Sequence, residues 1–309
     1  MKQAVYLILA VCFSGCVSST KQTDLLLANP LSIPAQHHIA DAPFINQEAG
    51  HCGPATLAMA MNSLGQSITA DELASHAFTP GAKGTFQSDM IGAARRQGLL
   101  ALPITGMENL LQEVAANNPV IVFENLALKW IPQWHYALVI GYDLKRRHIV
   151  MHSGPEAFKE WDLRKFERSW KLADYWGLVI LRPDQLSPTA NELTHLNGAS
   201  ALEQIGKTTE AATVYKTILS KWPQSLVALI GLGNIHFARH EFEKAIFFLR
   251  QATETHPNSA AAWHNRAIVE KSLKQKSAAR VSAKKALEKA ALESAELFNQ
   301  YKLSLSQIF

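Results

Sequence analysis

A chain of 309 residues is long enough for about two domains, and 48% hydrophobic with 18% charged residues is ordinary for a globular protein with a sizeable core. The net charge of +4 is mild, and the sequence has no run of Lys or Arg dense enough to indicate nucleic acid as the main partner. Nucleic-acid binding is therefore excluded as the leading interpretation.

The first sixteen residues have the order of a bacterial export signal. Lys2 supplies a positive charge, and residues 4–13 form an apolar stretch shorter than the roughly 20 residues that span a bilayer. Residues 13–16, Phe-Ser-Gly-Cys, resemble the lipobox of bacterial lipoproteins, although Phe13 stands where Leu is usual. The resemblance implies cleavage before Cys16 and lipidation of its thiol. A plain secretory signal is the alternative.

This processing would change the cysteine inventory. Cys12 lies in the segment that would be removed and Cys16 would carry lipid, so the mature protein would keep Cys52 as its one free thiol. Exported proteins usually pair or oxidise their thiols, and a lone one suggests a reactive role. Val17 after Cys16 fits sorting to the outer membrane, with the protein facing the periplasm.

The next two segments differ in regularity. Residues 17–39 are polar and irregular and are predicted to be a tether, whereas residues 40–183 are predicted to be a folded domain. Expected helices lie at residues 53–64, 69–76, 85–97 and 107–117, and expected strands at 99–104, 119–123, 135–142, 148–152 and 175–181. Helices followed by antiparallel strands indicate an α+β domain.

Residues 184–190 are predicted to be a linker, and residues 191–309 repeat themselves. Three columns share a period of about 34 residues, namely Ala211, Ala245 and Ala279; Pro223 and Pro257; and Ala199, Gly233 and Ala267. This period, with small residues where helices cross, resembles the tetratricopeptide repeat. About two and a half to three repeats and a terminal capping helix are expected, forming an all-α solenoid that would bind a protein partner. An ordinary helical bundle is the alternative.

The strongest local motif surrounds Cys52. The predicted helix begins beside this residue, so the free N–H groups and dipole of the helix would favour its thiolate. Gly53 would let backbone pass close to a bound carbonyl, and Pro54 suits the first helical turn. The side-chain amide of Gln47, five residues before Cys52, would form an oxyanion hole with the Cys52 N–H.

A second motif begins at His135, at the start of a strand that is otherwise predicted to be buried. A His at the exposed end of a rigid strand is well placed to meet a thiol at the end of a helix. Each residue alone has an ordinary explanation, because a single Cys is often a small core residue and most His residues are structural. The two motifs together favour a Cys–His pair.

At this point a family resemblance can be stated. Residues 42–182 resemble the papain-like cysteine peptidases that remove double-glycine leaders from bacteriocins, on the basis of four segments: Gln47, Cys52-Gly53-Pro54-Ala55, His135-Tyr136-Ala137 and Gly141-Tyr142-Asp143. The resemblance implies a papain-like fold in which Cys52 is the nucleophile and His135 its base. Together with the lipobox and the repeats, it resembles a group of Gram-negative lipoproteins.

One position departs from this family pattern. An Asp or Asn usually orients the imidazole from the end of the next strand, where this chain has Ser153 or, less fittingly, His152. Neither is a carboxylate, so stabilisation of the imidazolium would be weaker. Asp143, in the turn after the His135 strand, is a further candidate.

Other side chains leave alternatives open. Trp130 and Trp134 flank the His135 strand and would line a substrate cleft or belong to the core. His51 beside Cys52 would tune the thiol or face solvent. The histidines lack the close ligand spacing of a structural zinc site, so no metal and no cofactor are expected.

The sequence thus predicts an envelope lipoprotein that cleaves peptide bonds by a Cys–His thiolate mechanism, with repeats that bind a protein partner or the substrate. The alternative from another class is an adaptor lipoprotein whose peptidase-like domain is inactive and only binds. A role in bacteriocin processing is not expected, because that role is usually attached to a membrane transporter.

Overall fold

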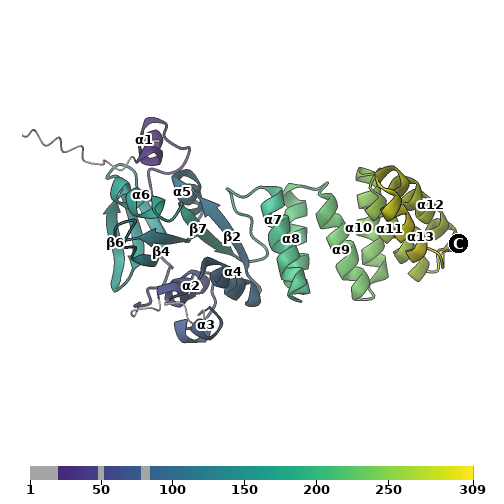
Figure 1. Cartoon of the computed structure of the whole chain (residues 1–309), viewed down its shortest axis with the longest axis horizontal. Coiled ribbons are helices and arrows are strands. Elements are labelled where there is room, and N and C mark those ends of the chain that lie inside the picture. Colours follow the sequence, from purple (N-terminus) through teal and green to yellow (C-terminus); the bar gives the residue numbers. More distant parts are fainter. Residues whose placement is uncertain (1–19, 48–51, 78–83, 309) are drawn as a thin grey trace, which may run out of the picture.

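The computed structural model describes residues 20–47, 52–77 and 84–308. An antiparallel sheet with helices forms one end of the elongated molecule, and helices alone form the rest (Figure 1). The predicted fold class, an α+β domain followed by an all-α repeat region, is confirmed.

The sheet has seven strands in the part of the chain that the structure describes, in the order β2-β7-β3-β4-β5-β6, with β1 paired to β4. The strands are β1 (Gln36–His38), β2 (Leu100–Thr105), β3 (Val120–Asn125), β4 (Trp134–Asp143), β5 (His148–Ser153), β6 (Glu156–Asp162) and β7 (Trp176–Leu181). Every pairing is antiparallel. The end of β3, the start of β4 and the end of β5 therefore lie side by side, where these strands meet the same rim of the sheet.

Helices cover both faces of this sheet. They are α1 (Lys21–Ala28), α2 (Cys52–Asn62), α3 (Ala70–Ala77), α4 (Gln87–Arg96), α5 (Met107–Ala115) and α6 (Leu163–Lys171). The helices α1, α5 and α6 lie on one side and α2, α3 and α4 on the other (Figure 1). Because both faces are covered, the middle of β4 is buried on both sides, as its continuous run of buried residues shows.

The segment predicted to be a tether is folded onto the domain from residue 20 onward. The backbone N–H groups of Gln22 and Thr23 donate to the Glu167 carboxylate of α6, at 3.1 and 2.7 Å, and Thr23 is fully buried. Strand β1 pairs with β4. The tether prediction is wrong for residues 20–39, because these contacts depend on distant residues that the local sequence does not reveal.

Two further elements were not predicted from the sequence. Strand β6 is an edge strand whose side chains are largely exposed, so it lacks a clear apolar alternation. Helix α6 follows it directly, and its N-cap Asp162 accepts hydrogen bonds from the N–H groups of Arg164 and Lys165. Strand β6 pairs with β5 at the edge of the sheet, and α6 packs over β3, β5 and β6.

The other predicted elements are present with ends shifted by a few residues. Helix α3 begins with a capping box: the Thr69 N–H donates to the Glu72 carboxylate at 2.8 Å, and the Glu72 N–H donates to the Thr69 hydroxyl at 3.2 Å. Helix α4 ends before Gly98, whose φ of 77° is in the left-handed region that glycine adopts most readily.

The repeat region consists of helix pairs. Its helices are α7 (Glu192–Gln204), α8 (Thr208–Lys221), α9 (Leu226–Ala238), α10 (Phe242–Thr255), α11 (Ala260–Ser272), α12 (Lys276–Glu293) and α13 (Ala295–Ser304). Asn191, Ser225 and Ser259 recur with the same period and each cap the first helix of a pair. A Cβ atom on Gly233 would lie 2.6 Å from Leu249, so the small residue permits a close helix crossing.

The sheet domain and the first helices of the repeat region share one hydrophobic core, whereas the later repeats have clusters of their own. Gly198 of α7 packs so closely on β2 that a Cβ atom there would lie 2.3 Å from Leu100. Buried Glu113 of α5 accepts hydrogen bonds from the hydroxyls of Ser187 and Thr189, which lie in the segment predicted to be a linker. This segment is therefore anchored in the structure, and the first repeat is an extension of the domain core.

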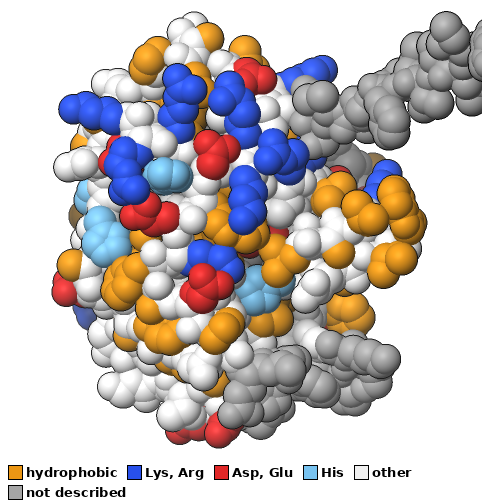
Figure 2. Space-filling model, turned by 90° about the vertical axis from the view of Figure 1, so that its left-hand side faces the viewer, with side chains coloured by type: hydrophobic (Ala, Val, Ile, Leu, Met, Phe, Trp, Pro, Cys, Tyr) orange, Lys and Arg blue, Asp and Glu red, His pale blue; other side chains and the backbone are white. Residues whose placement is uncertain are grey.

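Figure 2 shows the end of the molecule that faces away from the repeats, where Lys and Arg side chains gather with a few acidic ones between them. Among the residues that the structure describes, no helix has the length and apolar character needed to cross a bilayer.

Candidate functional site

Cys52 is the first residue of α2, and it is a free, half-buried cysteine. Its place at the helix N-terminus puts the thiol beside backbone N–H groups that have no partner within the helix. The thiol packs against the main hydrophobic core, while the rest of α2's first turns is buried. This is an environment in which a thiolate gains from the helix end and remains within reach of solvent.

Gln47 is held rigidly beside this helix. Its side-chain oxygen accepts a hydrogen bond from the Gly154 N–H at 3.1 Å, and its amide nitrogen donates to the Thr56 hydroxyl at 2.9 Å. The Gln47 backbone N–H also donates to the Gly154 carbonyl at 3.4 Å. A primary amide has two N–H bonds, so one remains for an oxyanion.

These bonds join three segments that are distant in the sequence. Thr56, one turn after Cys52 in α2, donates from its hydroxyl to the Tyr136 carbonyl of β4 at 3.3 Å. Tyr136 follows His135 directly, and Gly154 follows Ser153. The network from Gly154 through Gln47 and Thr56 therefore brings the start of the Cys52 helix to the edge where β4 begins and β5 ends.

His135 and Ser153 are hydrogen-bonded. His135 Nε2 lies 3.0 Å from Ser153 Oγ. When Nε2 carries the ring proton and donates it to this oxygen, Nδ1 keeps a lone pair for a second proton. In the part of the chain that the structure describes, no hydrogen bond joins the Cys52 thiol to His135.

The other orienting candidates lie elsewhere. Buried His152 uses both ring nitrogens, since Nε2 lies 3.1 Å from the Ala42 carbonyl and Nδ1 accepts from the Phe158 N–H at 3.2 Å. Asp143 is at the opposite end of β4 and accepts from the Arg146 N–H. Of the three residues considered from the sequence, the structure therefore places only Ser153 on the imidazole.

The surroundings of His135 favour its neutral form. Burial of the ring, and then the positive charge of Lys159 on β6, lower the pKa of His135 from 6.5 to about 4. Lys159 Nζ is itself bound to the Glu156 carboxylate at 2.6 Å. Ser153, the hydrogen-bond partner of the ring, supplies no negative charge to offset these effects. His135 is thus a neutral proton acceptor at neutral pH.

Glu124 is a notable neighbour that the sequence did not reveal. It is the cross-strand partner of His135 and fully buried, with one carboxylate oxygen 2.6 Å from the Ser169 hydroxyl. Burial raises the pKa of Glu124 to about 7, against the opposing effects of the Ser169 hydrogen bond and two nearby lysines. A charged residue directly after the apolar run of β3 was the available signal.

Gly53 packs against a different segment from the one expected. A Cβ atom on Gly53 would lie 2.8 Å from the Thr85 side chain, so the glycine lets the segment before α4 approach α2. The Thr85 carbonyl accepts a hydrogen bond from the Tyr136 hydroxyl at 3.0 Å. The described structure thus assigns Gly53 a packing role next to the candidate nucleophile.

The loop between β3 and β4 projects beside His135. Trp130 is 75% exposed and Trp134 48% exposed, and Leu128 and Ile131 in the same loop are also exposed. The Trp134 ring stacks on Phe123 with the ring centroids 5.1 Å apart. The two tryptophans are therefore surface residues at the edge that carries His135, and neither belongs to the core.

Some predicted residues lie outside the described part of the chain, namely Cys12, Cys16 and His51. Within the described residues, no group of three or more His, Cys, Asp or Glu side chains is arranged to hold a metal ion.

Two regions of the chain match known families. Residues 39–177 match the family described as "Peptidase_C39 like family", and residues 204–267 match the family described as "Tetratricopeptide repeat". The chain combines a C39-like peptidase domain with tetratricopeptide repeats. No curated protein matches the chain.

Solved structures resemble each region separately. A structure described as a C39-like peptidase from Bacillus anthracis is 18% identical with a TM-score of 0.42, covering 49% of this chain and 98% of that one. The peptidase domain of Streptococcus ComA is 19% identical with a TM-score of 0.38, covering 45% and 98%. The TPR2B domain of yeast Sti1 is 18% identical with a TM-score of 0.34, covering 38% and 96%.

Proposed function

We propose that the chain is a cysteine peptidase, with Cys52 as nucleophile and His135 as general base and acid. The observation that supports this most is the hydrogen-bond network that links the N-terminal turn of the Cys52 helix to the strand of His135 and to the turn after Ser153. A purely structural cysteine would have no need of an adjacent anchored amide and an oriented imidazole.

The reaction follows from the roles of these groups. Cys52 Sγ attacks the peptide carbonyl, its proton passes to His135, and the carbonyl oxygen becomes an oxyanion held by the Cys52 N–H and the second N–H of Gln47. The C–N bond then breaks as His135 gives the proton to the amine, which leaves a thioester. Water attacks the thioester, and Cys52 regains a proton as the acid product departs.

The lowered pKa of His135 affects how the thiol is activated. A neutral imidazole takes the thiol proton during attack, in contrast to a site with a stable imidazolium–thiolate pair. Ser153 orients the ring without stabilising its charged form. The proposed enzyme is therefore slower than one with a carboxylate at this position.

The test is labelling with a peptidyl vinyl sulfone, which reacts with an activated thiol. The purified protein is expected to gain one label on Cys52, detected by peptide mass mapping, and Cys52→Ala should gain none while keeping its circular dichroism spectrum. A wild-type protein that never labels would support the adaptor alternative, in which the domain only binds.

We further propose that Cys16 carries the lipid anchor and that the protein lies on the periplasmic side of the outer membrane. Helix α1 begins at Lys21 and is fixed to α6, so an anchor at Cys16 would hold the domain within about 18 Å of the lipid. Incorporation of labelled palmitate, abolished by Cys16→Ser, tests the anchor, and membrane fractionation tests the location.

The repeats are proposed to bind a protein partner. Phe247 of α10 is 56% exposed and lines a surface hollow of about 340 Å³ with Lys216 and Lys244. Val281 occupies the position on α12 that corresponds to Phe247 in the next repeat, and it is similarly exposed. Exposed hydrophobic side chains at matching repeat positions are suited to contact with another chain.

A further inference from the structure

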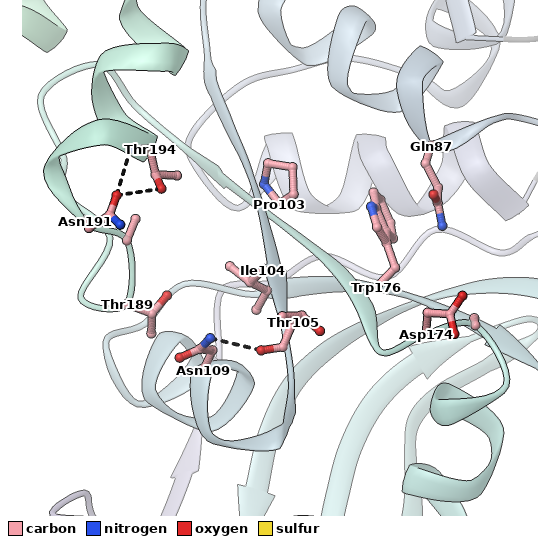
Figure 3. A pocket seen from close by; sticks show the side chains of 12 residues that line it. Gln87, Pro103, Ile104, Thr105, Asn109, Asp174, Trp176, Thr189, Asn191 and Thr194 are labelled. Atoms are coloured by element: carbon pink, nitrogen blue, oxygen red, sulfur yellow. Dashed lines mark hydrogen bonds between the residues drawn. The ribbon is translucent and has the colours of Figure 1, made fainter.

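A cavity lies where the C39-like domain meets the first repeat. It has a volume of about 470 Å³, and residues of the sheet domain and of the start of α7 line it together. Figure 3 shows Asn191 and Thr194 on one side, Gln87, Trp176 and Asp174 on the other, and Ile104 of β2 between them. Neither region alone would form this cavity.

The walls of this junction pocket are held in place. The segment that leads into α7 is anchored by Glu113 through Ser187 and Thr189, and the Ser187 N–H donates to the ring of buried His195 at 3.1 Å. Gly198 of α7 packs directly on β2. A pocket with fixed walls binds without the entropic cost of ordering them.

A chain of contacts links the pocket to the candidate active site. The Trp176 ring, which lines it, contacts Tyr136 edge to face with the ring centroids 6.1 Å apart. The Tyr136 hydroxyl binds the Thr85 carbonyl, and Thr85 packs on Gly53 beside Cys52. Gln87, two residues after Thr85, lines the pocket. The segment 85–87 thus separates the pocket from the nucleophile.

The chemistry of the lining indicates the occupant. Trp176 and Ile104 supply apolar surface, and the side-chain amides of Gln87 and Asn191 are N–H donors without a partner among the described residues. Such donors suit the carbonyl groups of an extended peptide. Among the described residues of the lining, Asp174 is the one that carries a charge, and it forms no ion pair with another described residue, so it favours a cationic side chain.

We propose that the junction pocket binds a segment of the same peptide that lies across Cys52, and that this segment carries a Lys or Arg next to Asp174. The proposal rests on the proposed peptidase function and adds a substrate class to it. The first repeat then contributes directly to substrate selection by completing a pocket wall.

The experiment measures peptide binding separately from cleavage. Fluorescence polarisation follows the binding of short labelled synthetic peptides, each with a single Lys or Ala at a scanned position, to the full mature chain carrying Cys52→Ala. At one scanned position of the peptide, and at no other, the Lys peptide is expected to bind better than the Ala peptide. Asp174→Asn, which suits the positive φ at this residue, should reduce that preference about fivefold.

A matched pair of variants tests the pocket itself. Thr194→Trp would fill it, whereas Leu193→Trp adds the same ring at the neighbouring, 63% exposed position outside it. In the Cys52→Ala background, Thr194→Trp should weaken binding about tenfold or more and Leu193→Trp less than about twofold. Alkylation of Cys52 by iodoacetamide in the otherwise wild-type protein should be unchanged in both, which shows that the fold and the thiol are intact.

The outcomes separate the two proposals. Equal binding by Thr194→Trp and Leu193→Trp, or no binding by any peptide of the set, would overturn the junction pocket. Binding that follows the expected pattern without any cleavage by the wild-type chain would support the pocket and count against the peptidase.

Discussion

The two regions of this molecule are stabilised by different kinds of contact. In the repeats, small residues such as Gly233 and caps such as Ser225 recur once per repeat, and each helix packs on its neighbours in sequence. In the C39-like domain, the candidate site is made by hydrogen bonds between residues far apart in the chain, such as Gln47 with Gly154. The repeat period makes the first kind of contact visible in the sequence. The second kind becomes visible only in the structure.

The difference also explains why the candidate catalytic residues lie in the C39-like domain and not in the repeats. Packing between sequence neighbours produces a similar surface in each repeat. Contacts between distant segments bring different functional groups together at a single place. The exception to this division is the first repeat, which packs into the domain core through Gly198 and forms part of the junction pocket. The following predictions test how far the two regions are separable.

The largest effect is expected at Gly198. Gly198→Val would force its side chain into Leu100 of β2 and should lower the free energy of unfolding by about 2 to 3 kcal/mol. Because the core is shared, thermal unfolding followed by circular dichroism and by intrinsic tryptophan fluorescence should shift together. Asn197→Val, on the exposed side of α7, is the control and should change stability little. A shift in the repeats alone would show that the regions unfold separately.

Glu124 should make stability depend on pH. Its pKa in the folded protein, about 7, lies above the unfolded value, so the folded state loses stability as pH rises from about 4.5 through 7. Glu124→Gln removes this titration and should stabilise the protein at pH 8, relative to wild type, by about 1 to 2 kcal/mol. Urea unfolding at pH 5 and pH 8 measures this difference. A variant that keeps the wild-type pH dependence would contradict the assignment.

The Ser153 hydrogen bond should contribute modestly to catalysis. Ser153→Ala removes the oxygen that lies 3.0 Å from His135 Nε2, and kcat/KM for a cleaved peptide should fall about five- to tenfold, or about 1 kcal/mol. Both ring nitrogens of His152 are bound to other groups, the Ala42 carbonyl and the Phe158 N–H, so His152→Gln serves as a control for general disturbance of β5. Unchanged kcat/KM in Ser153→Ala would contradict the orienting role, and an equal loss in His152→Gln would attribute the effect to disturbance of β5.

The smallest effect concerns Lys159. Activity should fall at low pH as His135 is protonated near its pKa of about 4. Lys159→Met removes a positive charge that disfavours the imidazolium, so the acidic limb of the kcat/KM profile should move to higher pH by a fraction of a unit. Lys165→Met is the matched control, because Lys165 acts on Glu124 and has no resolved effect on His135. No movement of the limb in Lys159→Met would place the base elsewhere.

The sequence was informative wherever the signal was local. Periodicity located the repeats, and apolar runs located most strands. Helix α1 and strand β1 were missed because their contacts are with Glu167 and β4, more than a hundred residues away. An apparently irregular segment can fold when distant partners satisfy its backbone groups.

The candidate site was predictable as residue types and not as an arrangement. The motifs around Cys52 and His135 indicated a nucleophile and a base, but their neighbours Glu124 and Lys159 became visible only through strand pairing. The sequence favoured Ser153 over His152 without deciding between them, because which side chain of a strand faces the ring depends on register. The junction pocket needed both regions together.

The central claim is tested most directly by hydrolysis of a fluorogenic peptide library. Wild-type protein should cleave at least one peptide, and both Cys52→Ala and His135→Ala should lose kcat/KM by about a thousandfold or more while retaining their folded spectra. Cleavage by Cys52→Ala at the wild-type rate would contradict the assignment of Cys52 as the nucleophile.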